Sequence, residues 1–182
     1  MTSRTRPECP KYFERDIDDD AMMVYRNGRH GVGVIPDIRP VAKGHTLTVP
    51  FECVPSVDDL SVTRYLKLQL AAKYAGLWLR ELYGIGDTYI ASATAGNQVP
   101  HAHIHRFPAG IDNEAWARFD GAEPRIDMRR TEVEDLVREI RFPEELAAEL
   151  DAALGDIAPP EFPEGARLMG RLAVNLAPEN NR

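Results

Sequence analysis

The chain has 182 residues, with 22 lysines and arginines against 29 aspartates and glutamates, and a formal net charge of -7. This length suits one domain whose core is large enough to be stable without disulfides. The acidic balance offers no positive field for a polyanion, which disfavours non-specific binding to DNA or RNA, and we expect no nucleic acid polymer as a partner. No apolar run approaches the roughly 20 residues that span a bilayer. We therefore expect no membrane insertion.

The two cysteines, Cys9 and Cys53, show neither the paired spacing of a metal site nor a disulfide framework. The first twenty residues lack the apolar segment of a secretion signal. Both observations favour a reducing compartment, and we expect the protein to be cytoplasmic.

The first half of the chain predicts three strands and one long helix. Residues 1–21 are polar and are expected to form a loosely attached N-terminal arm. Two apolar runs flank an Asn-Gly within residues 22–35, as in a β-hairpin, and HTLTVPF supplies a third strand. A capping box that starts at Ser56 precedes an apolar pattern of helical period, and Gly84 supplies a stop. These signals predict a helix over residues 57–83 whose apolar face packs on a sheet.

The second half predicts two further strands, over residues 87–95 and 99–107, separated by a Gly-Asn-Gln turn. A loop is expected next. Two short helices follow it, over residues 131–141 with Thr131 as the cap and over residues 143–154. A sheet with one long helix on it predicts an α+β layer pair.

Three of the five histidines lie together in HAHIH. Side chains two residues apart on a strand share a face, so His101, His103 and His105 would line one side of the sheet. Imidazole titrates near neutrality and can act as nucleophile, proton shuttle, metal ligand or pH sensor. Two of the three could share a metal, but the sequence has neither an H-E-x-x-H motif nor a cysteine cluster to complete the site. A purely structural role on a polar sheet face is the other alternative.

The stretch QVPHAHIHRFP resembles the signature of the histidine triad (HIT) family, in which histidines alternate with apolar residues on a strand. A second segment, VIPDIRPVAKGHTLTVP, is similar to the ribose-binding strand pair of that family. The two motifs are separated by one long predicted helix and a strand, as the family requires. The resemblance covers about residues 22–141. We therefore expect a HIT-like domain there, between the arm of residues 1–21 and a C-terminal extension over residues 142–182.

The resemblance implies an α+β fold with a HIT-like antiparallel sheet and one long helix packed on it, followed here by a C-terminal helical extension. Members of the family usually form homodimers, and they cleave nucleotides at the α-phosphate to release a nucleoside monophosphate. We therefore expect a nucleotidyl hydrolase or transferase that needs no cofactor. Its partner would be a small nucleotide conjugate such as a phosphoramidate, a dinucleoside polyphosphate or a mixed anhydride.

The resemblance also implies roles for four histidines. His103 matches the nucleophile, whose ring nitrogen attacks the α-phosphorus to form a nucleotidyl-histidine. The backbone carbonyl of His101 would fix the tautomer of that ring, and His105 would contact the phosphate and the leaving group. His45 matches the upstream histidine beside the site. Because a phosphoryl transition state spreads charge over its oxygens, such groups act by positioning and electrostatic stabilisation.

A ribose site is implied by the second motif. Asp37 matches the carboxylate that accepts hydrogen bonds from both ribose hydroxyls, and Ile35, Pro36 and Ile38 would form apolar walls around the base. On residue type alone, a turn role before a proline is the alternative for Asp37.

Two departures from the family pattern concern the phosphate. Asn97 and Gln98 stand where the family usually has a glutamine and then a small hydroxyl residue, and both keep the ability to hydrogen-bond. The Asn-x-Gly that contacts the phosphate is missing from the preceding strand, which reads TYIASAT. Two other functions therefore stay open: a HIT fold that performs a different reaction in a specialised pathway, and a non-catalytic nucleotide-binding module.

Overall fold

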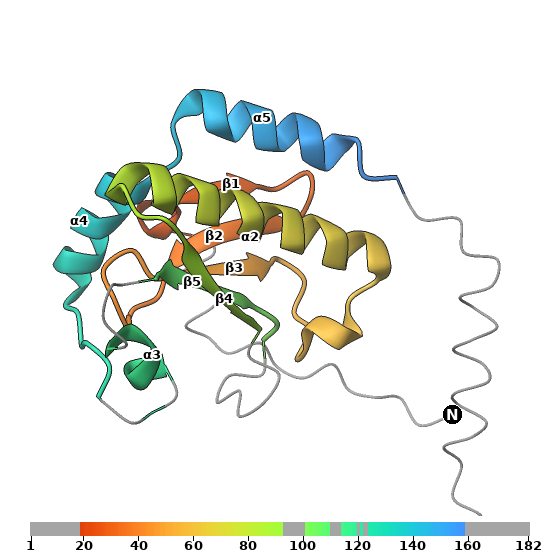
Figure 1. The fold of residues 1–182 in the computed structure, drawn as a ribbon. Helices are drawn as coiled ribbons and strands as arrows, with labels where there is room; N and C mark the ends of the chain where they lie inside the picture. Colours follow the sequence, from red (N-terminus) through yellow and green to blue (C-terminus); the bar gives the residue numbers. More distant parts are fainter. Residues whose placement is uncertain (1–18, 93–100, 110–113, 120, 122–123, 159–182) are drawn as a thin grey trace, which may run out of the picture.

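The computed structural model describes residues 19–92, 101–109, 114–119, 121 and 124–158 (Figure 1). Its five strands form one antiparallel sheet in the order β1-β2-β3-β5-β4. The strands are β1 Tyr25–Asn27, β2 Val32–Pro36, β3 Thr46–Pro50, β4 Thr88–Ser92 and β5 Ile104–Pro108. The helices are the single 3-10 turns η1 Asp20–Met22 and η2 Val57–Asp59, then α2 Val62–Tyr83, α3 Glu114–Phe119, α4 Arg130–Ile140 and α5 Glu144–Gly155.

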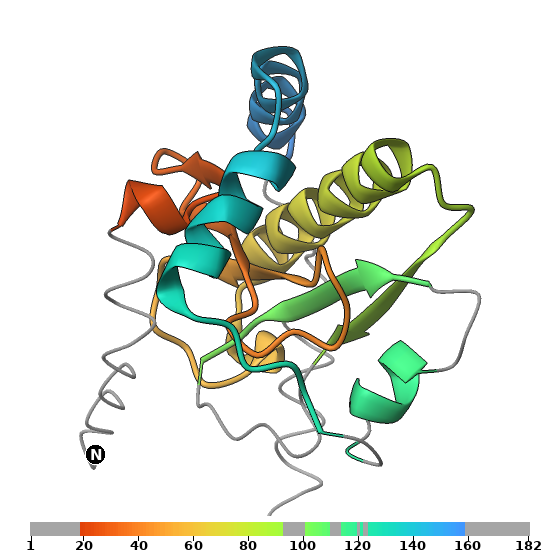
Figure 2. The same ribbon diagram turned by 90° about the vertical axis from the view of Figure 1, so that its left-hand side faces the viewer.

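The helices cover the sheet unequally. Figures 1 and 2 show α2 along one face with α5 beyond it, and α3 on the opposite side of the sheet. The predicted α+β fold, an antiparallel sheet with one long helix packed on it, is confirmed. Among the helices of the described residues, none is long and apolar enough to cross a membrane.

The long helix begins later than predicted. The Ser56 side chain accepts a hydrogen bond from the Asp58 N–H, but this caps only η2, after which Leu60 is extended. Ser61 then caps α2 itself. The prediction of one helix over residues 57–83 is therefore wrong at its start, because two serines five residues apart each satisfy the N–H groups of a separate helical turn. Gly84 ends α2 as predicted, in a left-handed conformation with φ of 62°.

Three other boundaries differ from the predictions. The segment that contains α3 was expected to be a loop. Thr131 lies inside α4, whose N-cap is Arg129, and the Glu132 carboxylate accepts hydrogen bonds from the backbone N–H and the guanidinium of Arg129. The strand predicted over residues 99–107 is shorter, since β5 begins at Ile104, while residues 93–100 lie outside the described part of the chain.

The strand register gives the sheet two chemically different faces. Ile35 pairs with Leu47, Leu47 with His105, and His105 with Ala91 across four neighbouring strands. Directly paired residues of antiparallel strands point to the same side. His105 therefore shares its face with the apolar cluster of Met23, Ile35, Leu47 and Val49.

The other face is covered by α2, and Arg106 lies between the two layers. Its Nε donates to the Ala72 carbonyl of α2 at 3.0 Å, and its Nη1 donates to the Thr88 hydroxyl of β4 at 3.1 Å. A Cβ on Gly76 would lie 3.1 Å from the guanidinium carbon. The absence of a side chain at Gly76 therefore makes room for the guanidinium of Arg106 between the sheet and α2.

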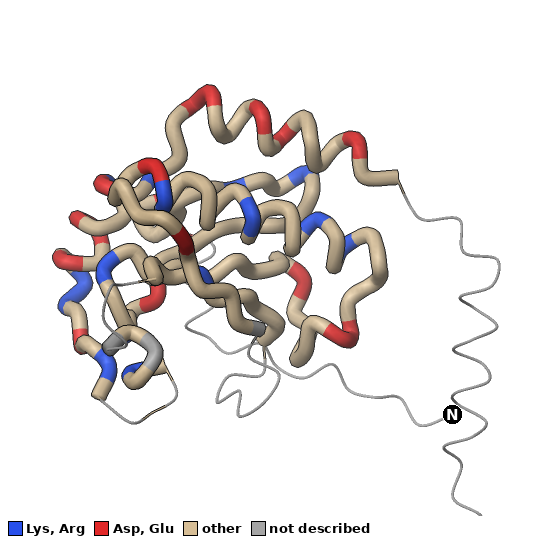
Figure 3. Tube along the Cα trace, in the orientation of Figure 1, with Lys and Arg blue, Asp and Glu red and all other residues tan. Residues whose placement is uncertain are grey.

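The helix α5 packs on this core rather than standing apart from it. Leu150 and Leu154 are fully buried in one cluster with Ala71 of α2 and Ile104 of β5. Asp151 accepts hydrogen bonds from the side chains of Tyr25 and Asn27 of β1. Figure 3 shows that α5 is acidic, whereas α4 carries both signs of charge. The boundary at residue 141 stays a prediction, and residues 159–182 lie outside the described part.

We expect Leu150→Ala to lower the free energy of unfolding by about 2–5 kcal/mol, because it removes a fully buried side chain and leaves a cavity. Urea denaturation monitored by circular dichroism measures this change. Ile126→Ala, at an exposed side chain in the segment before α4, is the control and should change stability little. A similarly small effect of Leu150→Ala would mean that α5 is not part of the cooperative core.

Candidate active site

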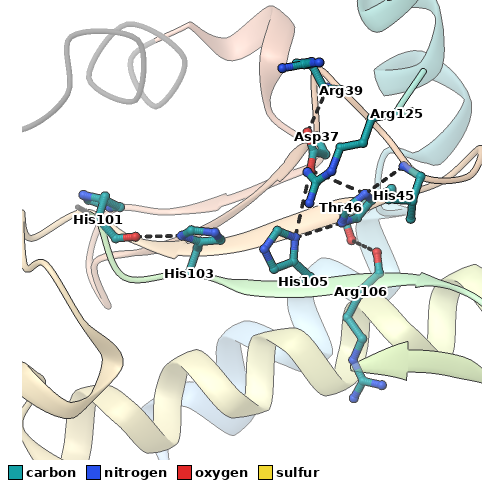
Figure 4. Close-up of polar contacts among 10 residues, drawn as sticks. Asp37, Arg39, His45, Thr46, His101, His103, His105, Arg106 and Arg125 are labelled. Carbon is teal, nitrogen blue, oxygen red and sulfur yellow. Dashed lines mark hydrogen bonds and ion pairs between the residues drawn. The ribbon is translucent and has the colours of Figure 1, made fainter. Parts of the chain in front are cut away.

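The first two histidines of HAHIH are held by backbone carbonyls. His101 Nε2 lies 2.9 Å from the carbonyl of Pro50, and His103 Nδ1 lies 2.7 Å from the carbonyl of His101 (Figure 4). A carbonyl only accepts hydrogen bonds, so the proton of neutral His103 is on Nδ1. The lone pair of the ring is therefore on Nε2, the nitrogen that a nucleophilic imidazole uses.

A second pair of rings connects the two sequence motifs. The Val41 N–H donates to His45 Nδ1 at 3.2 Å, and His45 Nε2 lies 2.9 Å from His105 Nδ1. Because His45 Nδ1 accepts, the proton of neutral His45 is on Nε2 and is donated to His105. His105 in turn has its proton on Nε2. One backbone amide thus sets the tautomers of two histidines.

All four of these histidines are buried and neutral at physiological pH. Burial lowers the pKa of His105 to about 3, with a further contribution from the positive charge of Arg125. Burial also lowers the pKa of His101 and His103, and it lowers that of His45 well below its usual value. A neutral imidazole retains the lone pair that nucleophilic attack requires.

Asp37 is a buried carboxylate that accepts hydrogen bonds from two arginines, and its Oδ2 also lies 3.4 Å from His45 Nδ1. Its Oδ1 accepts a hydrogen bond from the Arg39 N–H at 2.8 Å, and its Oδ2 lies 3.3 Å from Arg125 Nη1. Desolvation raises the pKa of Asp37, which the Arg39 amide and the charge of Arg125 partly oppose. Its Oδ2 is also 3.9 Å from His105 Nδ1, so the predicted ribose and phosphate sites adjoin.

Aromatic rings enclose the His45–His105 pair. Phe107, which follows two residues after His105 in β5, meets the His45 ring edge-on with centroids 5.1 Å apart. Phe119 of α3 meets the His105 ring in the same way at 5.1 Å. These contacts explain the desolvation of both histidines. α3, which sequence reasoning missed, therefore contributes a wall of the site.

The predicted base-contacting residues do not all lie together. Ile35 is buried on the histidine face, and Ile38 is 44% exposed beside Asp37. Pro36 pairs with Thr46 and lies in the alternate register, on the face covered by α2. Asn97 and Gln98 lie outside the described residues, so their contribution stays a prediction.

Asp37, His45 and His105 form a cluster of the kind that can hold a metal ion, with one ligand atom from each within 4.8 Å of the others. These atoms already have protein partners. His45 Nδ1 accepts from Val41, and the Arg125 guanidinium lies beside the Asp37 carboxylate. A divalent cation bound here would either displace that guanidinium or be repelled by its positive charge. That no metal takes part stays a prediction.

The model of the HIT domain family matches residues 18–110, about half of the chain. This span contains both motifs, from the β2–β3 pair with Asp37 and His45 to the histidines of HAHIH. The protein therefore belongs to the HIT family.

Curated relatives agree with this membership. The chain is 29% identical over 113 residues to the nitrilase and fragile histidine triad fusion protein NitFhit of Caenorhabditis elegans, covering 58% of this chain and 26% of that protein. It is 35% identical over 75 residues to a bis(5'-adenosyl)-triphosphatase of Dictyostelium discoideum, covering 40% of this chain and 50% of that enzyme. The chain thus spans half or less of the length of these two relatives.

Solved structures share the fold. A zinc-bound histidine triad family protein from Mycobacterium smegmatis superposes with a TM-score of 0.56 at 23% identity, covering 82% of this chain and 99% of that one. A Hit-like protein involved in cell-cycle regulation from Bartonella henselae gives a TM-score of 0.54 at 22% identity, covering 66% of this chain and 84% of that one. At this identity the likeness concerns the fold.

We expect acidification to destabilise the protein through its site histidines. The pKa of His105 is about 3 in the folded protein and about 6.5 in the unfolded chain, so the unfolded chain binds more protons between these values. The free energy of unfolding should therefore fall as the pH is lowered from about 6.5 to about 4.5. Urea denaturation at several pH values measures this slope.

Substitution separates His105 from other titrating groups. His105→Gln should make the slope smaller, because glutamine does not titrate in this range. The control is His30→Gln, at a partly exposed ring outside the site, which should change the slope less. An unchanged slope in His105→Gln would exclude His105 as a source of the pH dependence.

Proposed function

We propose that the protein is a nucleotidyl hydrolase or transferase that acts at the α-phosphate of a nucleotide conjugate through a nucleotidyl-histidine at His103. The single observation that carries this proposal is the 2.7 Å hydrogen bond between His103 Nδ1 and the His101 carbonyl, which sets the lone pair on Nε2. Family membership and the names of the relatives, which include a triphosphatase and a tetraphosphatase of dinucleoside polyphosphates, support it.

In the first step, the Nε2 lone pair of His103 forms a bond to the α-phosphorus while the bond from phosphorus to the leaving group breaks. The His101 carbonyl accepts from Nδ1–H and stabilises the positive charge that develops on the ring. His105, whose ring centroid lies 4.7 Å from that of His103, donates a hydrogen bond from its neutral Nε2–H to the phosphate or the leaving group and stabilises the charge that develops there.

In the second step, water or another acceptor attacks the same phosphorus, and the phosphorus–nitrogen bond breaks. The electron pair of that bond returns to His103, and a nucleoside monophosphate or its ester is released. His45 acts as a positioning residue in both steps, because its Nε2–H fixes the ring nitrogen on which His105 carries its proton.

Asp37 binds the ribose in this proposal. Its two oxygens accept hydrogen bonds from the hydroxyls, and Ile35 and Ile38 contact the base. A homodimer and a location in the cytoplasm, both expected from the sequence, stay parts of the proposal. Several large apolar side chains are exposed along α2 and the outer strand β4, and they support an interface between copies of the chain. They are Val62, Tyr65, Leu66, Leu77 and Ile90.

The test of the proposed function is His103→Asn. The variant should fold and bind nucleotide but not turn it over, because asparagine fits the site without a nucleophilic nitrogen. Wild-type protein quenched in acid after mixing with a dinucleoside triphosphate or a nucleoside phosphoramidate labelled at the α-phosphate should carry label in an acid-labile, base-stable linkage. The variant should carry none.

The matched control is His30→Asn, at a histidine outside the site, which should be labelled like the wild type. All samples are treated with a chelator first, since a metal-bound water would be the competing nucleophile. Near-wild-type turnover by His103→Asn would rule out direct attack by this ring. Binding without turnover by the wild type would favour the non-catalytic module. If the wild type neither bound nor turned over any of these substrates, a HIT fold repurposed for a different reaction would be favoured.

A second prediction concerns Asp37. Asp37→Ala should weaken binding of ribonucleotides by about tenfold or more and leave 2',3'-dideoxynucleotides nearly unaffected, because charge-assisted hydrogen bonds contribute roughly 1.5–3 kcal/mol each. Calorimetric titration measures both affinities. The control is Asp127→Ala, at an exposed carboxylate that pairs with Arg39. Equal losses for both ligand types would remove Asp37 from the ribose site.

A further inference from the structure

Arg125 reaches the histidines from the segment between α3 and α4, although no sequence motif pointed to it. Figure 4 shows its side chain beside Asp37 and His45, with Nη1 3.3 Å from Asp37 Oδ2. Its guanidinium lies 5.7 Å from the centroid of the Phe119 ring. The side chain is 31% exposed, so it borders both the buried site and solvent.

Arg125 donates to an oxygen of Asp37 that the ribose hydroxyls would use in the proposed site. Asp37 is only 6% exposed, and a buried carboxylate without partners would be strongly destabilising. The Arg39 amide and Arg125 supply those partners in the protein alone. Ribose hydroxyls would donate to the same two oxygens. Binding of a nucleoside therefore competes with Arg125 for Oδ2.

We propose that Arg125 exchanges partners when a nucleotide binds, leaving Asp37 to the ribose hydroxyls and pairing with the phosphate beside His105. This inference rests on the proposed function, and it assigns the residue that makes the site select phosphorylated ribonucleosides over unphosphorylated ones.

The geometry supports a short movement. Arg125 Nη1 and His105 Nδ1 are both neighbours of Asp37 Oδ2, at 3.3 and 3.9 Å. Rotation of the long arginine side chain about this oxygen brings the guanidinium towards His105. The planar guanidinium donates two parallel hydrogen bonds to a phosphate, which suits it to an α-phosphate that also contacts the histidines.

The exchange couples recognition of the ribose to recognition of the phosphate. When an unphosphorylated nucleoside binds to Asp37, Arg125 loses its carboxylate partner and gains no other anion. A nucleotide carries a phosphate, and this anion replaces the carboxylate as the partner of Arg125. Removal of Arg125 should therefore act in opposite directions on the two ligands, which a residue with a merely structural role would not do.

The experiment compares Arg125→Gln, Arg125→Lys and the wild type in calorimetric titrations with the four common ribonucleosides and their 5'-monophosphates. Arg125→Gln should weaken binding of the preferred monophosphate by about ten- to a hundredfold, the range of one charge-assisted hydrogen bond. Affinity for the matching nucleoside should be higher, because Asp37 no longer has to release Arg125 before it accepts the ribose hydroxyls. Arg125→Lys should restore part of the monophosphate affinity, since it keeps the charge but not the fork.

The matched control is Lys43→Gln, which removes one positive charge from the β2–β3 loop at a residue paired with Glu139. It should leave both affinities unchanged. Unchanged or weaker nucleoside binding by Arg125→Gln, or unchanged monophosphate affinity, would overturn the exchange while leaving the proposed function intact. If the wild type binds no monophosphate, the proposed function itself fails, and the inference fails with it. Should Arg125→Gln not fold, as judged by circular dichroism, Arg125→Lys decides by the same comparison.

Discussion

The register of β5 on β3 is the constraint on which the site depends. Leu47 pairs with His105 and Thr46 with Arg106, so the histidine faces the site and the arginine faces α2. A shift of one residue would exchange these two side chains between an apolar site and a helix-covered face. The same register brings the loop that carries Asp37 and His45 to the end of β5. Two motifs separated by a 22-residue helix thus form one cluster.

Burial shifts the pKa of the two kinds of titratable group in this cluster in opposite directions, because it disfavours the charged form of both. It disfavours the charged form of each histidine, which leaves the rings neutral and able to use a lone pair. It equally disfavours the ionised form of Asp37, but here the Arg39 amide and Arg125 oppose the desolvation. The site therefore holds neutral imidazoles next to one compensated carboxylate. A single arginine balances that charge from a distant part of the chain.

Local patterns predicted much of this fold and some of its site. The Asn-Gly hairpin, the stop at Gly84 and the alternation in HAHIH are short-range signals, and the first two appear in the structure where they were expected. The predicted start of α2 was wrong because Ser56 and Ser61 each cap a separate helical turn, with Leu60 extended between them. Arg125 could not be found, since its approach to Asp37 joins residues 88 apart without a motif. The opposite facing of Ile35 and Pro36 was available from the strand period of two.

The hydrogen bonds of Arg106 on one face of β5 help to set the position of His105 on the other face. The residue next to His105 is tied by its guanidinium to a backbone carbonyl of α2 and to the hydroxyl of Thr88. This insertion is possible because Gly76 has no side chain, since a Cβ there would lie 3.1 Å from the guanidinium carbon. The backbone of α2 consequently acts as a template for the position of the histidine strand. Substitutions on the helix, on the far side of the sheet from every group in the site, can thereby alter the alignment of the imidazoles without touching them.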